Sequence, residues 1–106
     1  MKRIIIHWTA GTYFPTNYEK EHYHFLVDAK GEIHYGVFKP EANEICKAGK
    51  YAAHTGGGNT GSIGVAICAM LNYKSAKSVG KYPIKKNNLK VQWIFAHNFA
   101  KNITFK

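Results

Sequence analysis

The sequence has 106 residues, which is enough for one small domain and too few for two. Its composition, with 45% hydrophobic and 20% charged residues, excludes a disordered tail and predicts a globular core. The net charge of +9, from 15 Lys and Arg against 6 Asp and Glu, indicates a polyanionic partner: nucleic acid, anionic lipid or an anionic cell-wall polymer.

Short apolar runs predict the strands of the first half of the chain. Residues 3–7 are typical of a short buried strand, because β-branched side chains pack well on a pleated surface. Residues 9–16 are expected to form a loop. Two strand-like runs follow at 23–27 and 33–37, and the turn signal at 28–31 between them predicts a hairpin.

The second half combines loops, a central strand and a helix. Residues 40–49 and the glycine-containing stretch 52–62 are predicted to be irregular, and 63–70 is the best candidate for a central strand. Beyond Asn87 or Asn88, which could cap a helix, apolar residues recur every three to four positions. These residues are Leu89, Trp93, Ala96, Ala100 and Ile103. The order predicts an α/β fold: one domain (1–106), with a mixed central β-sheet flanked by helices.

Cysteines and apolar runs limit the cellular context. Cys46 and Cys68 are too few for a disulfide framework, and the apolar neighbours of Cys68 predict a buried, reduced thiol. No run approaches the ~20 apolar residues of a membrane span. Residues 1–7 contain too short an aliphatic run for a signal peptide. We therefore expect a cytoplasmic protein that leaves the cell only through lysis or export.

Among six histidines, two stand where functional sites commonly form. His7 ends a predicted buried strand, which fixes the direction of its side chain beside an open loop. It is a candidate metal ligand or catalytic group, or else a hydrogen-bonded residue at a strand end. His54 lies in a glycine-rich loop with little to pack against it, which favours a functional role.

The remaining histidines have less specific interpretations. His22 and His24 would share one strand face, with Tyr23 opposite, if the strand begins that early. Such a pair can bind a metal, or it can be one surface and one packed histidine. His34 is expected to be a solvated strand residue, and His97 a hydrogen-bonded residue on a helix face.

Several common functional motifs are missing from the sequence. The glycine run fits neither a dinucleotide fingerprint nor a phosphate-binding loop, and there is no nucleophile elbow. Cysteine catalysis is disfavoured, since Cys68 is predicted to be buried and Cys46 has no evident base. The lysines are not interleaved with an RNA-binding aromatic signature, so no specific nucleic-acid partner is expected.

Four motifs occur together in a specific order. They are Ile4-Ile5-Ile6-His7-Trp8-Thr9-Ala10-Gly11, then His22-Tyr23-His24-Phe25-Leu26-Val27-Asp28, then Ala52-Ala53-His54-Thr55, then Asn59-Thr60-Gly61-Ser62-Ile63-Gly64-Val65. In this order and spacing the chain resembles the type 2 N-acetylmuramoyl-L-alanine amidases, zinc amidases that include phage endolysins and peptidoglycan recognition proteins. The resemblance covers nearly the whole chain.

The resemblance implies roles for individual residues. His7 corresponds to the first zinc ligand of the family, and Tyr23 to the tyrosine that polarises the scissile carbonyl or positions water. His54 corresponds to a catalytic-site histidine beside the zinc ion that is usually not a ligand. Asn59 and Ser62 match the loop before the central strand, as substrate contacts or structural residues. The remaining candidate substrate contacts are Trp8, Thr9 and His24.

The implied reaction is hydrolysis of the amide between N-acetylmuramic acid and the L-alanine of the stem peptide in peptidoglycan. Zinc would act on the carbonyl as a Lewis acid and lower the pKa of its bound water. In the family, a second and a third ligand follow the last helix, whereas this sequence ends at Lys106. We therefore expect a C-terminally shortened domain that lacks two of the three usual zinc ligands.

This departure leaves two hypotheses. Either the chain is a zinc amidase, with His24 or His54 as a substitute ligand, or it is an inactive amidase-like module that binds wall fragments or is vestigial. The missing segment would also expose sheet surface, which a second copy of the chain, as a homo-oligomer, could cover. A phage origin would account for release by lysis.

Overall fold

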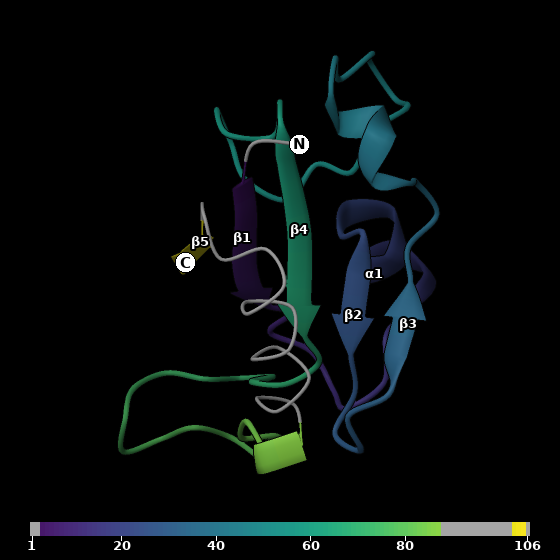
Figure 1. Ribbon diagram of the computed structural model, residues 1–106. Helices are drawn as coiled ribbons and strands as arrows, with labels where there is room; N and C mark the ends of the chain where they lie inside the picture. Colours follow the sequence, from purple (N-terminus) through teal and green to yellow (C-terminus); the bar gives the residue numbers. More distant parts are fainter. Residues whose placement is uncertain (1–2, 88–102, 106) are drawn as a thin grey trace.

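The computed structural model describes residues 3–87 and 103–105. The elements in chain order are β1 (Arg3–Trp8), α1 (Asn17–His22), β2 (Phe25–Val27), β3 (Ile33–Tyr35), the 3₁₀-helix η1 (Pro40–Asn43), β4 (Ser62–Ile67) and β5 (Ile103–Phe105). The strands form one five-stranded sheet in the order β3-β2-β4-β1-β5 (Figure 1). β4 pairs in parallel with β1 and β2, β1 with β5 also in parallel, and β2 and β3 are antiparallel.

The central strand β4 alternates large and small side chains, and this alternation gives the sheet two different faces. Ile63 and Val65 are paired in register with Ile4 and Ile6 of β1, so their side chains share one face. These four residues form a buried cluster with Val27 of β2. The intervening positions of β4 point to the other face and are small: Ser62, Gly64 and Ala66.

The sheet bears out the mixed α/β class, and the predicted hairpin between β2 and β3 is confirmed. Its turn is closed by a hydrogen bond from the Gly31 N–H to the Asp28 carbonyl (3.0 Å), and Gly31 adopts a φ of 88° that suits glycine. The expected helical flanks are sparse, because α1 and η1 are short. β1 reaches one residue further than expected, to Trp8.

Helix α1 is the element that the sequence analysis missed. Thr16 caps it through a reciprocal pair of bonds: the Glu19 N–H donates to Thr16 Oγ1 (3.1 Å), and the Thr16 N–H donates to Glu19 Oε1 (2.9 Å). Consequently His22 is helical and does not share a strand face with His24, so the expected histidine pair on one strand is wrong.

Three predicted strands are shorter than expected, and β2 begins at Phe25 and not at residue 23. β4 ends at Ile67, although the chain stays buried as far as Met70, where a φ of 73° breaks the extended conformation. β3 ends at Tyr35 because the chain then turns at Gly36 against the end of α1. The predicted loop at 40–49 contains η1.

Most of the predicted C-terminal helix, and His97 with it, lies outside the described residues. Lys86 and Asn87 are helical, so Asn87 is inside a helix and is not its cap. Ile103 was expected on the apolar face of the helix, but it begins β5, which pairs with β1.

A buried polar junction joins η1 to the sheet. Asn43 is fully buried, and its Oδ1 accepts hydrogen bonds from His24 Nε2 (2.9 Å) and from the Ala52 N–H (3.0 Å). Its Nδ2 donates to the carbonyls of Ala52 (2.9 Å) and Asn59 (3.3 Å). Asn43 thus fixes the loop 52–59 against the start of β2, and this loop carries His54.

We predict that Asn43→Ala lowers the free energy of unfolding by about 2–4 kcal/mol, because several buried polar groups lose their partner at once. Urea denaturation measures the loss. Glu44→Ala, which truncates the exposed neighbour of Asn43, is the matched control and should change stability by less than about 0.5 kcal/mol. Equal losses in the two variants would contradict the structural role of Asn43.

Candidate active site around a histidine pair

Two histidines from distant parts of the chain meet on the small-residue face of the sheet. His7, near the end of β1, places its Nε2 at 3.0 Å from Nδ1 of His54, in a hydrogen bond. The two rings meet edge to face, with their centroids 5.1 Å apart. The structure thus brings together the two residues that the sequence analysis singled out most strongly.

The bare backbone of Gly64 makes room for this pair. A Cβ atom at position 64 would lie 2.6 Å from Cγ of the His54 ring, closer than side-chain atoms approach one another. Gly64 of β4 lies beside Ile5 of β1 in the parallel register, and Ala66 lies beside His7. Small residues at 64 and 66 therefore form the floor on which the two imidazoles rest.

The loop that carries His54 is held by Asn59. Its side-chain Oδ1 accepts hydrogen bonds from the backbone N–H groups of His54 (3.0 Å) and Thr55 (2.9 Å). This contact gives Asn59 a structural role, one of the two alternatives that the sequence left open. Its amide oxygen is used inside the loop, so Asn59 supports the site by fixing the backbone of His54.

Tyr23 completes the site from the end of α1. Its ring centroid lies 5.3 Å from that of His7. The carbonyl of Tyr23 is packed against Gly36, where a Cβ atom would lie within 1.9 Å of the carbonyl oxygen, so the turn after β3 holds Tyr23 in place. Burial and, secondly, the charges of Glu19 and Tyr18 raise the pKa of the Tyr23 hydroxyl above its usual value.

A groove of about 190 Å³ opens beside this site. Its lining residues are Thr9, Tyr18, Glu19, His22, Tyr23, Ala53 and His54. Three of them come from α1, and sequence reasoning missed their part in the groove because it missed the helix. His22 contributes through its Nδ1, which donates to the carbonyl of Ala53 (2.8 Å) and joins α1 to the His54 loop. The capping box formed by Thr16 and Glu19 is the sequence signal that could have revealed this helix.

Two predicted substrate contacts are structural residues instead. His24 is 2% exposed, and both ring nitrogens are used: Nδ1 accepts from the Gly64 N–H (2.9 Å), and Nε2 donates to Asn43. Ser62 is fully buried, where its hydroxyl accepts from Arg3 Nε (2.6 Å) and donates to the carbonyl of Gly58 (2.5 Å). Burial keeps both side chains away from a ligand, and His24 has no nitrogen left for a metal.

The other two predicted contacts remain open to a substrate. Thr9 lines the groove while its Oγ1 accepts from the N–H groups of Gly11 (3.1 Å) and Ala69 (3.3 Å). Trp8 is 42% exposed and packs its ring against Tyr73, with centroids 6.0 Å apart. Trp8 points to the opposite sheet face from His7, because neighbouring residues of a strand alternate.

Burial keeps the imidazole of His54 largely uncharged. Burial, and secondly the charges of His7 and His24, lowers the pKa of His54 to about 3. Its Nε2 is buried and has no hydrogen-bond partner among the residues that the structure describes, which adds to the cost of a charged ring. Burial also lowers the pKa of His24, against the opposite effect of the hydrogen bond that its Nε2 donates to Asn43. His54 is therefore neutral at physiological pH.

The histidine pair offers two of the nitrogen donors that a zinc site needs. Two nitrogen ligands on one tetrahedral zinc ion, each bonded at about 2.0–2.1 Å, lie roughly 3.3 Å apart. The 3.0 Å between His7 Nε2 and His54 Nδ1 is close to this spacing. The other ring nitrogen of His54, Nε2, is buried without a hydrogen-bond partner among the described residues, which is uncommon for a histidine that serves packing alone. Within the described residues these two donors fit zinc, but they do not make up the usual three ligands.

The described residues hold one other group of potential metal ligands: Asp28, Glu32 and His34 at the hairpin turn. The Asp28 carboxylate accepts from the N–H groups of Lys30 (2.9 Å) and Glu32 (3.0 Å), and from His34 Nε2 (2.8 Å). These contacts explain the cluster as a stabilised turn. His34 is therefore paired with Asp28 and is not the solvated residue that the sequence suggested.

The predicted thiol state of Cys68 agrees with the structure. Its side chain is fully buried, and burial raises the pKa of the thiol to about 12, so it is inert as a nucleophile. Neither cysteine of the chain is in a disulfide. Among the described helices, none is long and apolar enough to cross a membrane.

A pair of imidazoles beside a half-buried tyrosine, at the edge of a groove, is compatible with a hydrolytic site. A family model described as N-acetylmuramoyl-L-alanine amidase matches residues 1–102. The chain therefore belongs to the N-acetylmuramoyl-L-alanine amidase family. No curated protein and no solved structure gives a match to the chain.

Acid is predicted to destabilise the metal-free protein. Because the folded pKa of His54 is about 3, against about 6.5 unfolded, the unfolded chain binds the extra proton between these values. Between pH 7.5 and 5.0 this one group should cost on the order of 2 kcal/mol. Urea denaturation in the presence of a chelator measures the change. His54→Gln should lose clearly less, and an equal loss in this variant would contradict the assignment.

Proposed function

We propose that the protein hydrolyses the amide bond between N-acetylmuramic acid and the L-alanine of the peptidoglycan stem peptide. Membership of the amidase family supports this reaction class. The observation that carries the proposal is the contact of His7 with His54 beside Tyr23, in an open groove. As a corollary we propose that the protein acts on the wall after release from the cell.

His7 and His54 would hold the zinc ion in this scheme. The ion, when bound, supplies a Lewis acid for the scissile carbonyl and an acidified water molecule. His54 is uncharged without any metal, since its pKa is about 3, so no proton has to leave it before its Nδ1 can act as a ligand. Asn59 fixes the backbone of His54 and Gly64 lies against its ring, which together limit how far the ring can turn away.

Tyr23 is suited to donate a hydrogen bond to the oxygen that becomes negative during hydrolysis. Its raised pKa keeps the phenol protonated throughout the physiological range. Its ring lies beside His7 and lines the groove, so a carbonyl held at the histidine pair is within reach of the hydroxyl. A fixed donor of this kind stabilises the charge that develops in the transition state.

A module that binds wall fragments without hydrolysing them is the second candidate. The specific observation in its favour is that the histidine pair offers two nitrogen donors, whereas a catalytic zinc site usually has three protein ligands. Metal content and turnover separate the two functions. Stoichiometric zinc with release of L-alanine-terminated peptides supports the hydrolase, whereas wall binding without either supports the module. Pairing of two copies of the chain stays a prediction.

We predict that His7→Ala abolishes zinc binding and hydrolysis together, because it removes the donor at the end of β1. Zinc is measured by elemental analysis, and hydrolysis on purified peptidoglycan. His34→Ala removes an imidazole from the hairpin turn and is the matched control, since it should retain zinc. Full zinc content in His7→Ala would overturn the proposed site.

We predict that Tyr23→Phe lowers kcat by roughly 10²-fold, as expected for the loss of one hydrogen-bond donor to the oxyanion. The ring and its packing against His7 remain, so zinc content and the unfolding midpoint should stay near the values of the unmodified protein. Tyr18→Phe, at an exposed position of the same groove, is the control. A wild-type kcat for Tyr23→Phe would exclude the hydroxyl from the reaction.

A further inference from the structure

The charges of this protein are divided very unevenly along the chain. All six acidic residues lie within residues 1–44, together with five of the 15 basic ones. Residues 45–106 contain ten lysines and no Asp or Glu. The first part is thus nearly neutral, and the whole excess of positive charge belongs to the second part.

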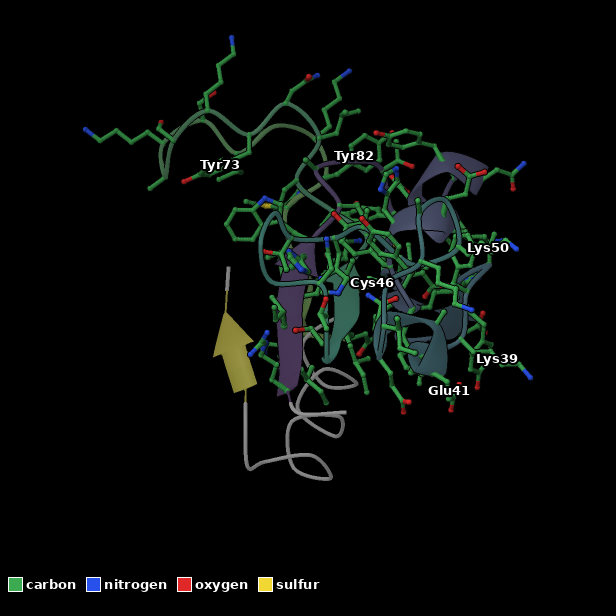
Figure 2. The ribbon with its side chains drawn as sticks, turned by 90° about the horizontal axis from the view of Figure 1, so that it is seen from above. Lys39, Glu41, Cys46, Lys50, Tyr73 and Tyr82 are labelled. Carbon is green, nitrogen blue, oxygen red and sulfur yellow. The ribbon has the colours of Figure 1, made fainter. Side chains whose placement is uncertain are left out.

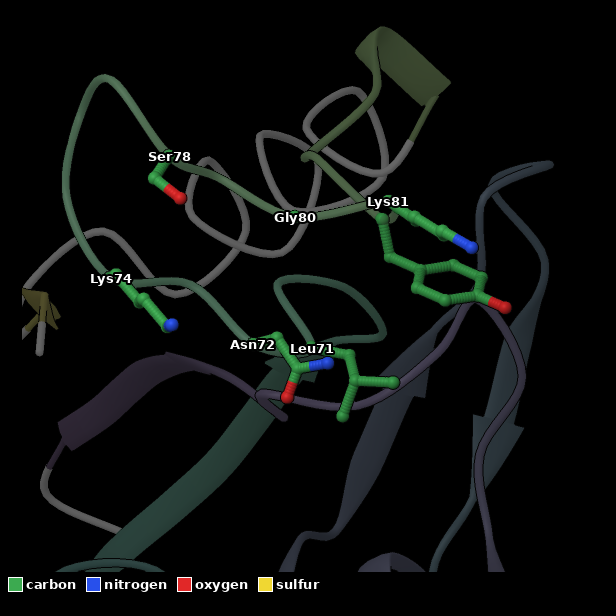
Figure 3. A pocket seen from close by; sticks show the side chains of 7 residues that line it. Leu71, Asn72, Lys74, Ser78, Gly80 and Lys81 are labelled. Carbon is green, nitrogen blue, oxygen red and sulfur yellow. The ribbon is translucent and has the colours of Figure 1, made fainter.

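Part of this excess lies on one surface loop, residues 71–82. The loop encloses a cavity of about 520 Å³, whose lining includes Leu71, Asn72, Lys74, Ser78, Gly80, Lys81 and Tyr82 (Figure 3). Lys74, Lys77 and Lys81 are exposed. Within the described residues no carboxylate pairs with any of these three ammonium groups, and the ion pair found there joins His34 and Asp28. The loop therefore presents uncompensated positive charge.

The base of this loop is fixed to the segment that follows β1. The Met70 N–H donates to the Tyr82 carbonyl (2.6 Å), which closes the loop, and the Leu71 N–H donates to the Gly11 carbonyl (3.0 Å). The hydroxyl of Tyr13 donates to the Pro83 carbonyl (2.9 Å). Thr9, at the start of this segment, lines the groove beside His54. The segment 9–13 thus contacts both the base of the loop 71–82 and the groove beside His54.

We propose that the loop 71–82 is a second peptidoglycan-binding site, which holds carboxylate groups of a stem peptide while the polymer also occupies the groove at His7. The identity of the polymer rests on the proposed function. Stem peptides carry free carboxylates, and the ammonium groups of Lys74 and Lys81 attract them over several ångströms. Leu71 and Tyr82 add carbon surface to the same cavity, which suits short aliphatic side chains such as that of alanine.

The composition of the loop favours this partner over nucleic acid. Its positive groups are all lysines, and the chain has a single arginine, Arg3, whose guanidinium is already bonded to Ser62 and to the carbonyl of Thr60. Lysine acts as a hydrated point charge, without the planar fork that arginine offers to phosphates. The rings of Tyr73 and Tyr82 each make an edge-to-face contact within the protein, with Trp8 and with Tyr13, and so do not form a stacked row of free rings for bases.

The test compares two double variants that lose the same charge. Lys74→Gln with Lys81→Gln neutralises the loop, while Lys39→Gln with Lys50→Gln neutralises exposed lysines near η1, on the opposite side of the molecule from Tyr73 (Figure 2). Each pair is made in the His7→Ala background, so that the polymer is not digested. Binding is measured by co-sedimentation with peptidoglycan that has been stripped of phosphodiester polymers, over a series of salt concentrations.

The expected result is a Kd about 5- to 20-fold higher for the loop variant at low salt, and less than about twofold higher for the control. Equal changes in Kd for the two double variants would overturn the loop site. So would binding that occurs only with walls that keep their phosphodiester polymers, or a larger loss of affinity for duplex DNA than for peptidoglycan. If the loop variant alone loses binding although the protein with His7 intact hydrolyses nothing, the proposed function fails and the loop site stands. If the protein with His7 intact hydrolyses peptidoglycan and both double variants bind it equally well, the loop site fails and the proposed function stands.

Discussion

The imidazole of His54 rests on the bare backbone of Gly64, and the whole candidate site depends on this contact. Strand β4 places large side chains on one face, where they form the core with β1, and small ones on the other. With a side chain at position 64, His54 would be displaced and could not reach His7 at 3.0 Å. The strand that stabilises the fold is thus also the floor of the site, and its two functions use alternate residues.

His24 and His54 both lie in the sequence motifs, but their burial differs and so do their roles. His24 uses both nitrogens, for Asn43 and for the backbone of Gly64, and is closed off from solvent. His54 uses one nitrogen for His7 and lines an open groove. The two are nevertheless linked, because Asn43 also bonds the loop that carries His54. The buried network positions the reactive pair without taking part in it.

The two key histidines were recognised from their places at a strand end and in a glycine-rich loop. Periodicity in the sequence predicted β1 to β4 and the hairpin, but it assigned Ile103 of β5 to a helix. It failed for α1 because six residues without a buried side chain leave no apolar repeat, although the capping box of Thr16 and Glu19 was visible. Periodicity also could not predict the hydrogen bond between His24 and Asn43, because the two residues are 19 positions apart in the sequence. Asn43 lies in a 3₁₀-helix, for which the sequence has no local pattern. The length of β4 was overestimated for a similar reason: Cys68 to Met70 stay buried outside the strand.

The exposed lysines of the loop 71–82 give one side of the molecule a positive charge that no described carboxylate pairs with. Near a negatively charged surface this uneven charge experiences a torque, so the protein turns the loop toward that surface before any contact forms. Orientation of this kind shortens the search for a productive encounter, and it fades once dissolved ions screen the field beyond about 10 Å. The protein would therefore be oriented as it approaches the polymer at low ionic strength, and would lose this orientation at high ionic strength.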